Sequence, residues 1–133
     1  MPVGQAHIAP VSRDDVAEAA AAAIVSRHHG GKVYELTGPR SYSFDEVAGL
    51  ASGFAGVPIH YAACSPGDYL QRARMEMRDP WPHAFATLCA SISQGRYGQV
   101  SPDIEGLLGR PAEGLEDFFR RTLREEPGAN APP

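Results

Sequence analysis

Residues 33–50 place the strongest local constraint on the fold of this 133-residue chain. They begin with a short apolar and aromatic run, Val33–Leu36, which has the composition of a β-strand. Gly38-Pro39 ends the run, because glycine admits positive φ whereas proline lacks an amide donor and fixes φ. Ser43 and Glu46 then have the spacing of a capping box, in which each side chain accepts a bond from the other residue's backbone N–H. This segment therefore predicts a strand, a turn and a helix.

Five further segments carry apolar residues at helical spacing between a start signal and a stop signal. The start signals are serine caps and prolines, since a serine hydroxyl satisfies a free helix N–H and a proline has none to satisfy. With the helix after Ser43, the sequence predicts five or six helices. The five segments are Ser12–Gly30, Ser65–Met77, Pro82–Gly95, Ser101–Gly109 and Leu115–Leu123.

Three short runs have strand composition: Ile8–Val11, Val33–Leu36 and Ile59–Cys64. Pro10 restricts the first to a sheet edge, because proline cannot donate to a ladder. Two or three such strands do not form a stable sheet alone. The predicted fold class is therefore α/β, α+β-like and mostly helical. Its five or six helices surround a small two- or three-stranded, mainly parallel sheet that dimerisation completes.

Size and charge narrow the class of protein. We expect residues 1–126 to form one domain and the Pro/Ala/Gly-rich residues 127–133 to be a disordered tail. A net charge of −4 argues against a nucleic-acid partner, which requires a basic face. No run approaches the roughly 18 apolar residues of a membrane span, and the N-terminus lacks the pattern of a secretory signal. The expected location is the cytoplasm.

Cysteine and histidine residues give no strong signal for metal or disulfide chemistry. Cys64 and Cys89 both lie in apolar contexts, which favours small buried side chains over a reactive thiol. His28 and His29 are neighbours in a helical segment, where adjacent side chains point apart. The sequence predicts no metal site.

The order of the motifs resembles the C-terminal half of NmrA-like proteins, the atypical short-chain dehydrogenase/reductase group. That group includes NAD(P)-binding redox-sensor regulators and quinone or azo reductases. The similarity runs over about residues 4 to 123, and each matching stretch alone is short. The stretches are residues 8–17, 34–39, 43–48, 107–111 and 115–119.

The chain departs from this family in its cofactor half. The family carries an N-terminal Rossmann half, in which a glycine-rich turn and a helix N-terminus hold the pyrophosphate. This sequence has no G-x-G-x-x-G, and Gly30-Gly31 stands before a predicted strand rather than after it. It also has no Tyr-x-x-x-Lys pair, since Lys32 is its only lysine. We therefore expect no dinucleotide cofactor on this chain alone.

The resemblance assigns the segment from Tyr69 to Tyr97 to the wall over the substrate. Its aromatic and thioether side chains suit a bulky apolar ligand. Core packing is the alternative for Phe85 and Met77, which lie on helical stripes, and for whichever of His60 and Tyr61 faces inward. The predicted substrate-binding residues are Trp81, Met75, Met77, Phe85, Tyr97 and His60, and the predicted hydrogen-bond donors or acid/base residues are His83, Tyr69 and Tyr61.

Three functions fit these observations. The leading one is a cofactor-independent cyclase or isomerase that holds a polyketide- or polyene-like substrate by shape and hydrogen bonding. The others are a non-catalytic ligand-binding or regulatory module, and a subunit or fragment of an NAD(P)-dependent reductase. A homodimer is expected in each case, because the alanine-faced first helix and the strand edges would otherwise expose apolar surface and unpaired backbone.

Overall fold

The computed structural model describes residues 1–26 and 29–125. Within those residues it has six helices and one two-stranded sheet, so the predicted number of helices is confirmed. The predicted tail, 127–133, and His28 lie outside the described residues. In chain order the elements are β1 (His7–Ile8), α1 (Arg13–Val25), β2 (Tyr42–Ser43), α2 (Phe44–Ala55), α3 (Pro66–Glu76), α4 (Trp81–Ser93), α5 (Asp103–Leu108) and α6 (Leu115–Glu125).

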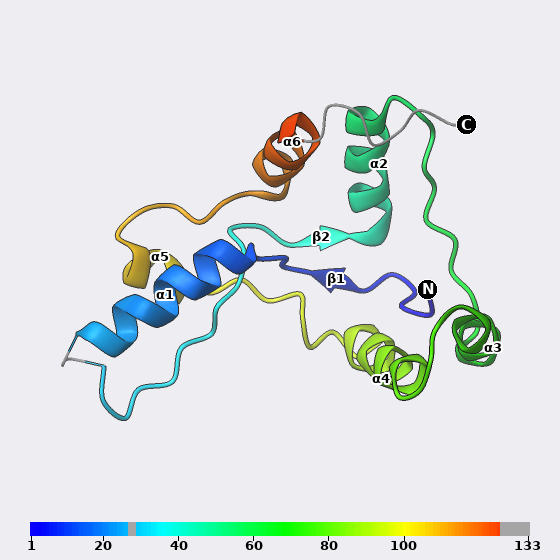
Figure 1. The fold of residues 1–133 in the computed structure, drawn as a ribbon, viewed down its shortest axis with the longest axis horizontal. Helices are drawn as coiled ribbons and strands as arrows, with labels where there is room; N and C mark the ends of the chain where they lie inside the picture. The colour runs from blue at the N-terminus through cyan, green and yellow to red at the C-terminus, as the bar shows by residue number, and fades with distance from the viewer. Residues whose placement is uncertain (27–28, 126–133) are drawn as a thin grey trace.

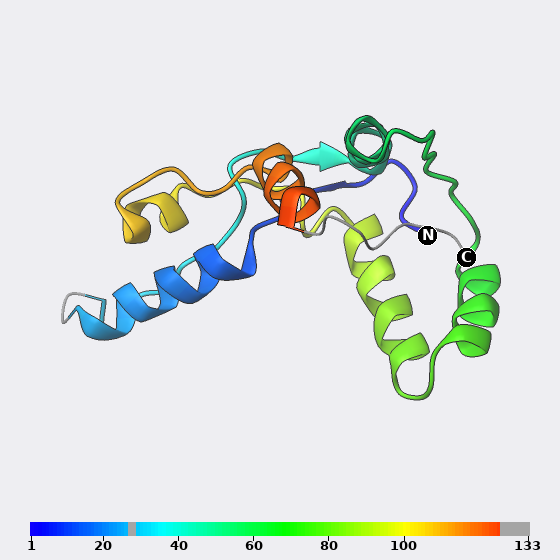
Figure 2. The ribbon, with the colours of Figure 1, turned by 45° about the horizontal axis from the view of Figure 1, so that its top comes forward.

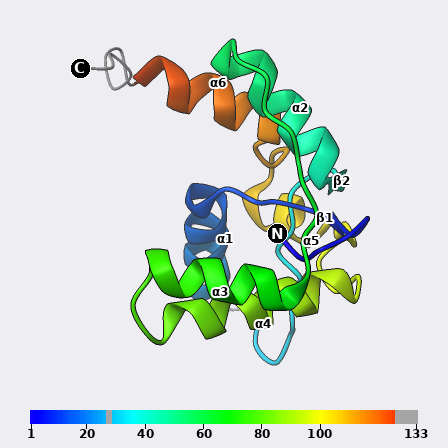
Figure 3. The ribbon, with the colours of Figure 1, turned by 90° about the vertical axis from the view of Figure 1, so that its right-hand side faces the viewer.

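The helices associate in three pairs around the small sheet. Helix α1 contacts α5 at one end of the molecule, and α3 contacts α4 at the other end (Figure 1). Helices α2 and α6 form the third pair, which stands apart from α3 and α4 when the molecule is turned (Figures 2 and 3). None of the described helices combines the length and apolar character needed to span a bilayer.

Serine caps fix the starts of three helices as the sequence predicts. Ser12 Oγ accepts a bond from Asp15 N at 3.1 Å, and Ser65 Oγ accepts one from Asp68 N at 3.1 Å. The capping box before α2 is complete, with Ser43 N donating to Glu46 Oε2 at 2.8 Å and Glu46 N donating to Ser43 Oγ at 3.2 Å. These contacts satisfy amides that have no partner inside the helix.

The predicted mainly parallel sheet is wrong for the described residues. Strands β1 and β2 pair antiparallel, with His7 opposite Ser43 and Ile8 opposite Tyr42. Two runs with strand composition, 33–36 and 59–64, join no ladder. Strand composition favours extended backbone, but a ladder also needs a neighbouring strand. Completion of the sheet by a second copy stays a prediction, since the structure holds one chain.

The apolar core is divided between two clusters. One joins the N-terminus to α4 through Val3, Cys89 and Ile92, with Tyr61 and Tyr69 packed against it. The other joins α1 to α5 and the chain after α5. Its members are Ala19, Ile104 and Ala112. Part of the alanine face of α1 is thus covered within the chain.

The two cysteines differ in burial. Cys89 is almost fully buried, as expected for a small apolar side chain, whereas Cys64 is half-buried. Both are free thiols.

Candidate functional site

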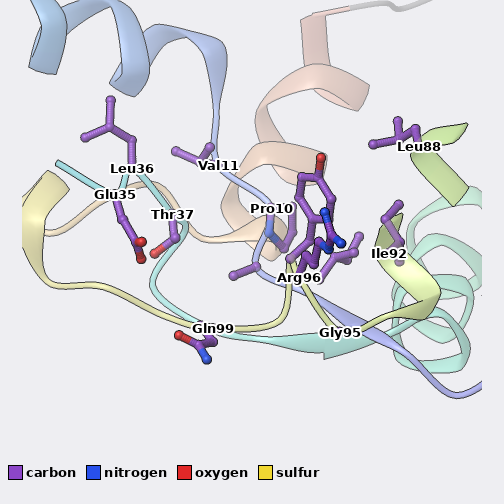
Figure 4. Close-up of a pocket in the computed structure, with 13 residues that line it drawn as sticks. Pro10, Val11, Glu35, Leu36, Thr37, Leu88, Ile92, Gly95, Arg96 and Gln99 are labelled. Carbon is purple, nitrogen blue, oxygen red and sulfur yellow. The ribbon is translucent and has the colours of Figure 1, made fainter. Parts of the chain in front are cut away.

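A groove of about 770 Å³ lies between the chain that leads into α1, the extended segment before β2, and the C-terminal end of α4 (Figure 4). Three stretches far apart in the sequence therefore meet around one space. The lining residues are Ile8, Ala9, Pro10, Val11, Glu35, Leu36, Thr37, Leu88, Ile92, Gly95, Arg96, Tyr97 and Gln99.

Backbone contacts hold these stretches together. Ala9 N donates to Tyr97 O at 2.7 Å, and Gly38 N donates to Ala9 O at 3.2 Å. A Cβ at Gly38 would lie 1.8 Å from Pro10 O, so this close approach requires glycine. Backbone hydrogen bonds and close backbone packing therefore fix the positions of the segments from which the lining side chains project.

The walls of the groove are mostly apolar. Leu88 and Ile92 project from α4, while Val11 and Leu36 lie on the facing stretches (Figure 4). Such a space suits an apolar ligand, because binding would remove apolar surface of both walls from contact with water.

Two charged side chains line the groove, Glu35 and Arg96. Figure 4 shows Arg96 beside Pro10, and Glu35 beyond Thr37 toward the other end. Among the described residues, neither side chain has a hydrogen bond or ion pair, since the bond at Glu35 uses its backbone N–H. A ligand with polar groups at its ends could therefore contact both.

Of the predicted site residues, Tyr97 lines this groove. Trp81 and Phe85 lie on α4 with Leu88, but nearer its start, and their ring centroids are 6.0 Å apart. Both are exposed, at 58% and 39%. Met75 on α3 is also exposed. Their predicted role in ligand binding stays a prediction.

Tyr69 and Met77 line a different, smaller pocket of about 180 Å³. Burial raises the pKa of the Tyr69 phenol, and the neighbouring Cys89 thiol raises the pKa further. Burial likewise raises the pKa of Cys89. Tyr69 is therefore a neutral hydrogen-bond donor at physiological pH rather than a base.

The other predicted polar residues do not line this groove. Tyr61 donates to Met1 O at 2.9 Å and its ring packs against Phe44. His83 Nε2 lies 3.1 Å from Arg74 Nη2, at the start of α4. His60 is exposed on the connection after α2. Tyr61 and Tyr69 pack against the same core cluster, and Met1 contacts Tyr61 and lines the pocket of Tyr69. The catalytic roles of Tyr61, Tyr69 and His83 stay predictions.

Sequence reasoning missed most of the groove. Residues 8–11 and 33–36 have strand composition, which does not by itself indicate that their side chains form a ligand wall. The available signals were Pro10 and Gly38, because a proline and a glycine within strand-like runs often mark irregular backbone near another chain segment.

The helix N-termini of this chain do not fit a dinucleotide pyrophosphate. Ser12, Ser43 and Ser65 already accept bonds from first-turn amides. Five helices carry an acidic residue in the first turn, which would repel a phosphate. The exception is α4, where Pro82 removes one of the amides that a phosphate would need. In the described part of the chain, no group of three or more His, Cys, Asp and Glu residues could hold a metal ion.

Comparison with known proteins identifies several relatives, although no protein-family model matches the chain. An NAD(P)H azoreductase of Xenophilus azovorans is 28% identical over 125 residues, which are 90% of this chain and 42% of the azoreductase. The (4-alkanoyl-5-oxo-2,5-dihydrofuran-3-yl)methyl phosphate reductase of Streptomyces griseus is 31% identical over 117 residues, which are 86% of this chain and 41% of that enzyme.

Solved structures show the same fold. An NADPH-dependent quinone oxidoreductase of Escherichia coli superposes with a TM-score of 0.85 at 26% identity, over 90% of this chain and 44% of that protein. The triphenylmethane reductase of Citrobacter gives a TM-score of 0.83 at 23% identity, over 91% of this chain and 43% of that protein. The chain thus spans less than half the length of the relatives that it matches.

Proposed function

We propose, on the premise that this chain is homologous to the C-terminal half of NmrA-like atypical short-chain dehydrogenase/reductases, that it forms the acceptor-binding part of an NAD(P)H-dependent reductase. The acceptor class that fits is a flat conjugated molecule such as a quinone. The groove is the observation that carries this proposal. Its volume of about 770 Å³ suits a small organic ligand, and its walls are apolar with polar side chains at the ends.

The contribution of this chain is to bind and orient the acceptor. Leu88 and Ile92 on one side and Leu36 on the other would hold the rings, and Arg96 would attract an electronegative oxygen at one end. Since the helix N-termini do not fit a pyrophosphate, the proposal places the nucleotide on residues outside this chain.

Titration calorimetry with 1,4-naphthoquinone tests the proposal. We expect the full chain to bind it, and Leu88→Asp to weaken binding at least about tenfold, because a carboxylate would replace an apolar wall. Leu88→Met should restore most of the affinity. The matched control is Met75→Asp, since Met75 is an exposed apolar residue on α3 that does not line the groove.

Two results would end the proposal. One is that the wild-type chain binds no quinone at millimolar concentration. The other is that Leu88→Asp and Met75→Asp weaken binding equally while circular dichroism shows both variants folded.

The cyclase or isomerase expected from the sequence gains no support from the Xenophilus and Streptomyces relatives, which are named as reductases. Nor does any hydrogen bond join Tyr61, Tyr69 and His83 in the described residues, although Tyr61 and Tyr69 pack against the same cluster. A purely regulatory module would also need a ligand pocket, so quinone turnover in the presence of a nucleotide-binding half separates it from a reductase.

A further inference from the structure

The groove is lined by two opposite charges that do not pair with each other. Glu35 and Arg96 both line it, at opposite sides in Figure 4, and no ion pair joins them in the described part of the chain. Exposed charges elsewhere do pair, since Arg40 Nη2 lies 2.8 Å from Glu46 Oε1. The two groove charges are therefore available to a ligand.

Two more polar side chains of the groove have no protein partner. In the part of the chain that the structure describes, neither the Tyr97 hydroxyl nor the Gln99 amide has a hydrogen bond. The Thr37 hydroxyl differs, because it accepts a bond from Ser101 N at 2.9 Å and donates to a backbone carbonyl. Thr37 thus stabilises the fold, whereas Tyr97 supplies a second donor from the position next to Arg96.

Backbone bonds anchor both charged positions. Glu35 N donates to Asp103 Oδ2 at 2.9 Å, and the carbonyl of Tyr97, the residue after Arg96, accepts a bond from Ala9 N at 2.7 Å. A shift of either segment would break one of these bonds. Groups on fixed segments lose less conformational entropy on binding than groups on mobile ones. The separation of the two charges is consequently a property of the fold.

The space between the charges is apolar and large. Leu36, Leu88 and Ile92 line it, and its volume of about 770 Å³ lies in the upper half of the roughly 300–1,000 Å³ range for small-molecule sites. A ligand with an apolar body alone would cover both charges without pairing them, which costs free energy. A matching ligand therefore carries a polar group at each end of an apolar body.

We propose that the groove selects dipolar aromatic ligands, with an anionic group at Arg96 and a hydrogen-bond donor, such as an aromatic amine, at Glu35. This inference rests on the proposed function and narrows its acceptor class to molecules with an acidic and a donor substituent at opposite ends. A guanidinium binds sulfonate or carboxylate oxygens through charge-assisted bonds, and a carboxylate accepts bonds from an amine. An unsubstituted quinone offers Arg96 only a carbonyl oxygen and offers Glu35 no donor.

Titration calorimetry with three naphthalenes tests the selection. The probes are 5-aminonaphthalene-1-sulfonate, which carries both groups on opposite rings, and naphthalene-1-sulfonate and 1-naphthylamine, which carry one group each. We expect the full chain to bind the first at least about fivefold more tightly than either of the others. A higher salt concentration should weaken binding of the two sulfonates but not of 1-naphthylamine, because Arg96 is exposed to solvent.

Variants that remove one charge identify the residues responsible. Arg96→Gln should weaken binding of both sulfonates at least about fivefold and change the affinity for 1-naphthylamine less than about twofold. Glu35→Gln should weaken binding of the two amines and leave naphthalene-1-sulfonate at least as tightly bound. The matched controls are Arg78→Gln and Glu105→Gln, which remove exposed charges that do not line the groove and should change none of the three affinities.

The outcomes separate this selection from the proposed function. Equal affinities for the three probes, or an Arg96→Gln variant that behaves like Arg78→Gln, overturn the selection, and binding of 1,4-naphthoquinone then still supports the acceptor site. The expected preferences without any binding of 1,4-naphthoquinone at millimolar concentration support the dipolar site and end the acceptor proposal. Binding of none of the four compounds overturns both.

Discussion

The α1–α5 pair and the α3–α4 pair differ in how completely they bury their apolar side chains. In the first, Ala19 and Ile104 are completely buried against each other's helices, so the contact is close and uses small side chains. In the second, Cys89 and Ile92 turn toward the core, while Trp81 and Phe85 on the same helix remain exposed.

The two helix pairs also differ in their ion pairs. The buried Asp15 carboxylate in α1 accepts bonds from Arg110 Nη2 at 2.8 Å and from Glu113 N at 2.6 Å, which tie α1 to the chain after α5. Arg110 also pairs with Glu18. In the described residues, the α3–α4 pair has no comparable buried ion pair. The first pair is therefore fixed by specific polar contacts, whereas the second leaves apolar side chains of α4 exposed.

Gly38→Ala should have the largest effect on stability. Gly38 packs against Pro10, which leads into α1 and lines the groove together with Ile92 of α4. The new Cβ would lie 1.8 Å from Pro10 O, so residues 8–11 must move away from residues 36–38. We expect a loss of about 4 kcal/mol in the free energy of unfolding, measured by urea denaturation. The control is Gly106→Ala in α5, where a Cβ meets nothing within 4 Å and helix propensity favours alanine. Equal stability of the two variants would contradict the close backbone approach.

Ile104→Ala tests whether α1 and α5 are packed more tightly than α3 and α4. Ile104 is 1% exposed, so its truncation should leave a cavity and cost about 3 kcal/mol. Leu88→Ala, at a position 37% exposed on α4, should cost about 1 kcal/mol, since much of that side chain is already in water. Thermal or urea unfolding measures both. Similar losses would mean that α1 and α5 are no more tightly packed than the groove wall.

Asp15 gives the α1–α5 region a pH dependence. Burial raises the pKa of its carboxyl, but the N–H of Glu113 and the guanidinium of Arg110 outweigh burial, so the pKa lies below the usual value of 3.8. A folded pKa below the unfolded one stabilises the native state above the unfolded pKa, and this stabilisation is lost as pH falls through the folded pKa. The affected window is therefore acidic, below about pH 4.

Asp15→Asn should cost about 2 kcal/mol at pH 7, because it weakens the bonds to Arg110 and Glu113. It should also flatten the fall in stability below about pH 4. The control is Asp68→Asn in the first turn of the exposed α3 start, which should change the acid slope less. An unchanged slope in Asp15→Asn would exclude this carboxylate as the source of acid sensitivity.

The starts of α1, α2 and α3 could be predicted because their causes are local, whereas α1 ends at Val25, earlier than the predicted stop at Gly30. Ser43 and Glu46 are three residues apart, and Gly56 and Gly109 end their helices at φ 69° and 66°. The sheet could not be predicted in the same way, because pairing of His7 with Ser43 depends on residues far along the chain. Val33–Leu36 has strand composition, but the local sequence does not show which other strand it would pair with.

The groove shows the same limit for a site. Its Tyr97 was predicted from the aromatic content of the 69–97 segment, whereas Val11 and Leu36 were missed. These residues come together because Gly38 approaches Pro10, and residue spacing does not reveal such a contact. The aromatic residues nearer the start of α4 belong to the same helical stripe, but they extend past the groove.

Trp81→Ala should have the smallest effect on stability. Its naphthoquinone affinity also distinguishes the site predicted from the sequence from the groove. The indole is 58% exposed and its main partner is the Phe85 ring, so we expect a loss below about 1 kcal/mol on unfolding. Because Trp81 does not line the groove, the Trp81→Ala variant should bind naphthoquinone with an affinity within about twofold of wild type. A tenfold loss of affinity in Trp81→Ala, with Leu88→Asp unaffected, would move the ligand to the outer end of α4 and restore the site predicted from the sequence. Wild-type affinity in Trp81→Ala, with a loss in Leu88→Asp, would mean that the exposed start of the α3–α4 pair takes no part in acceptor binding.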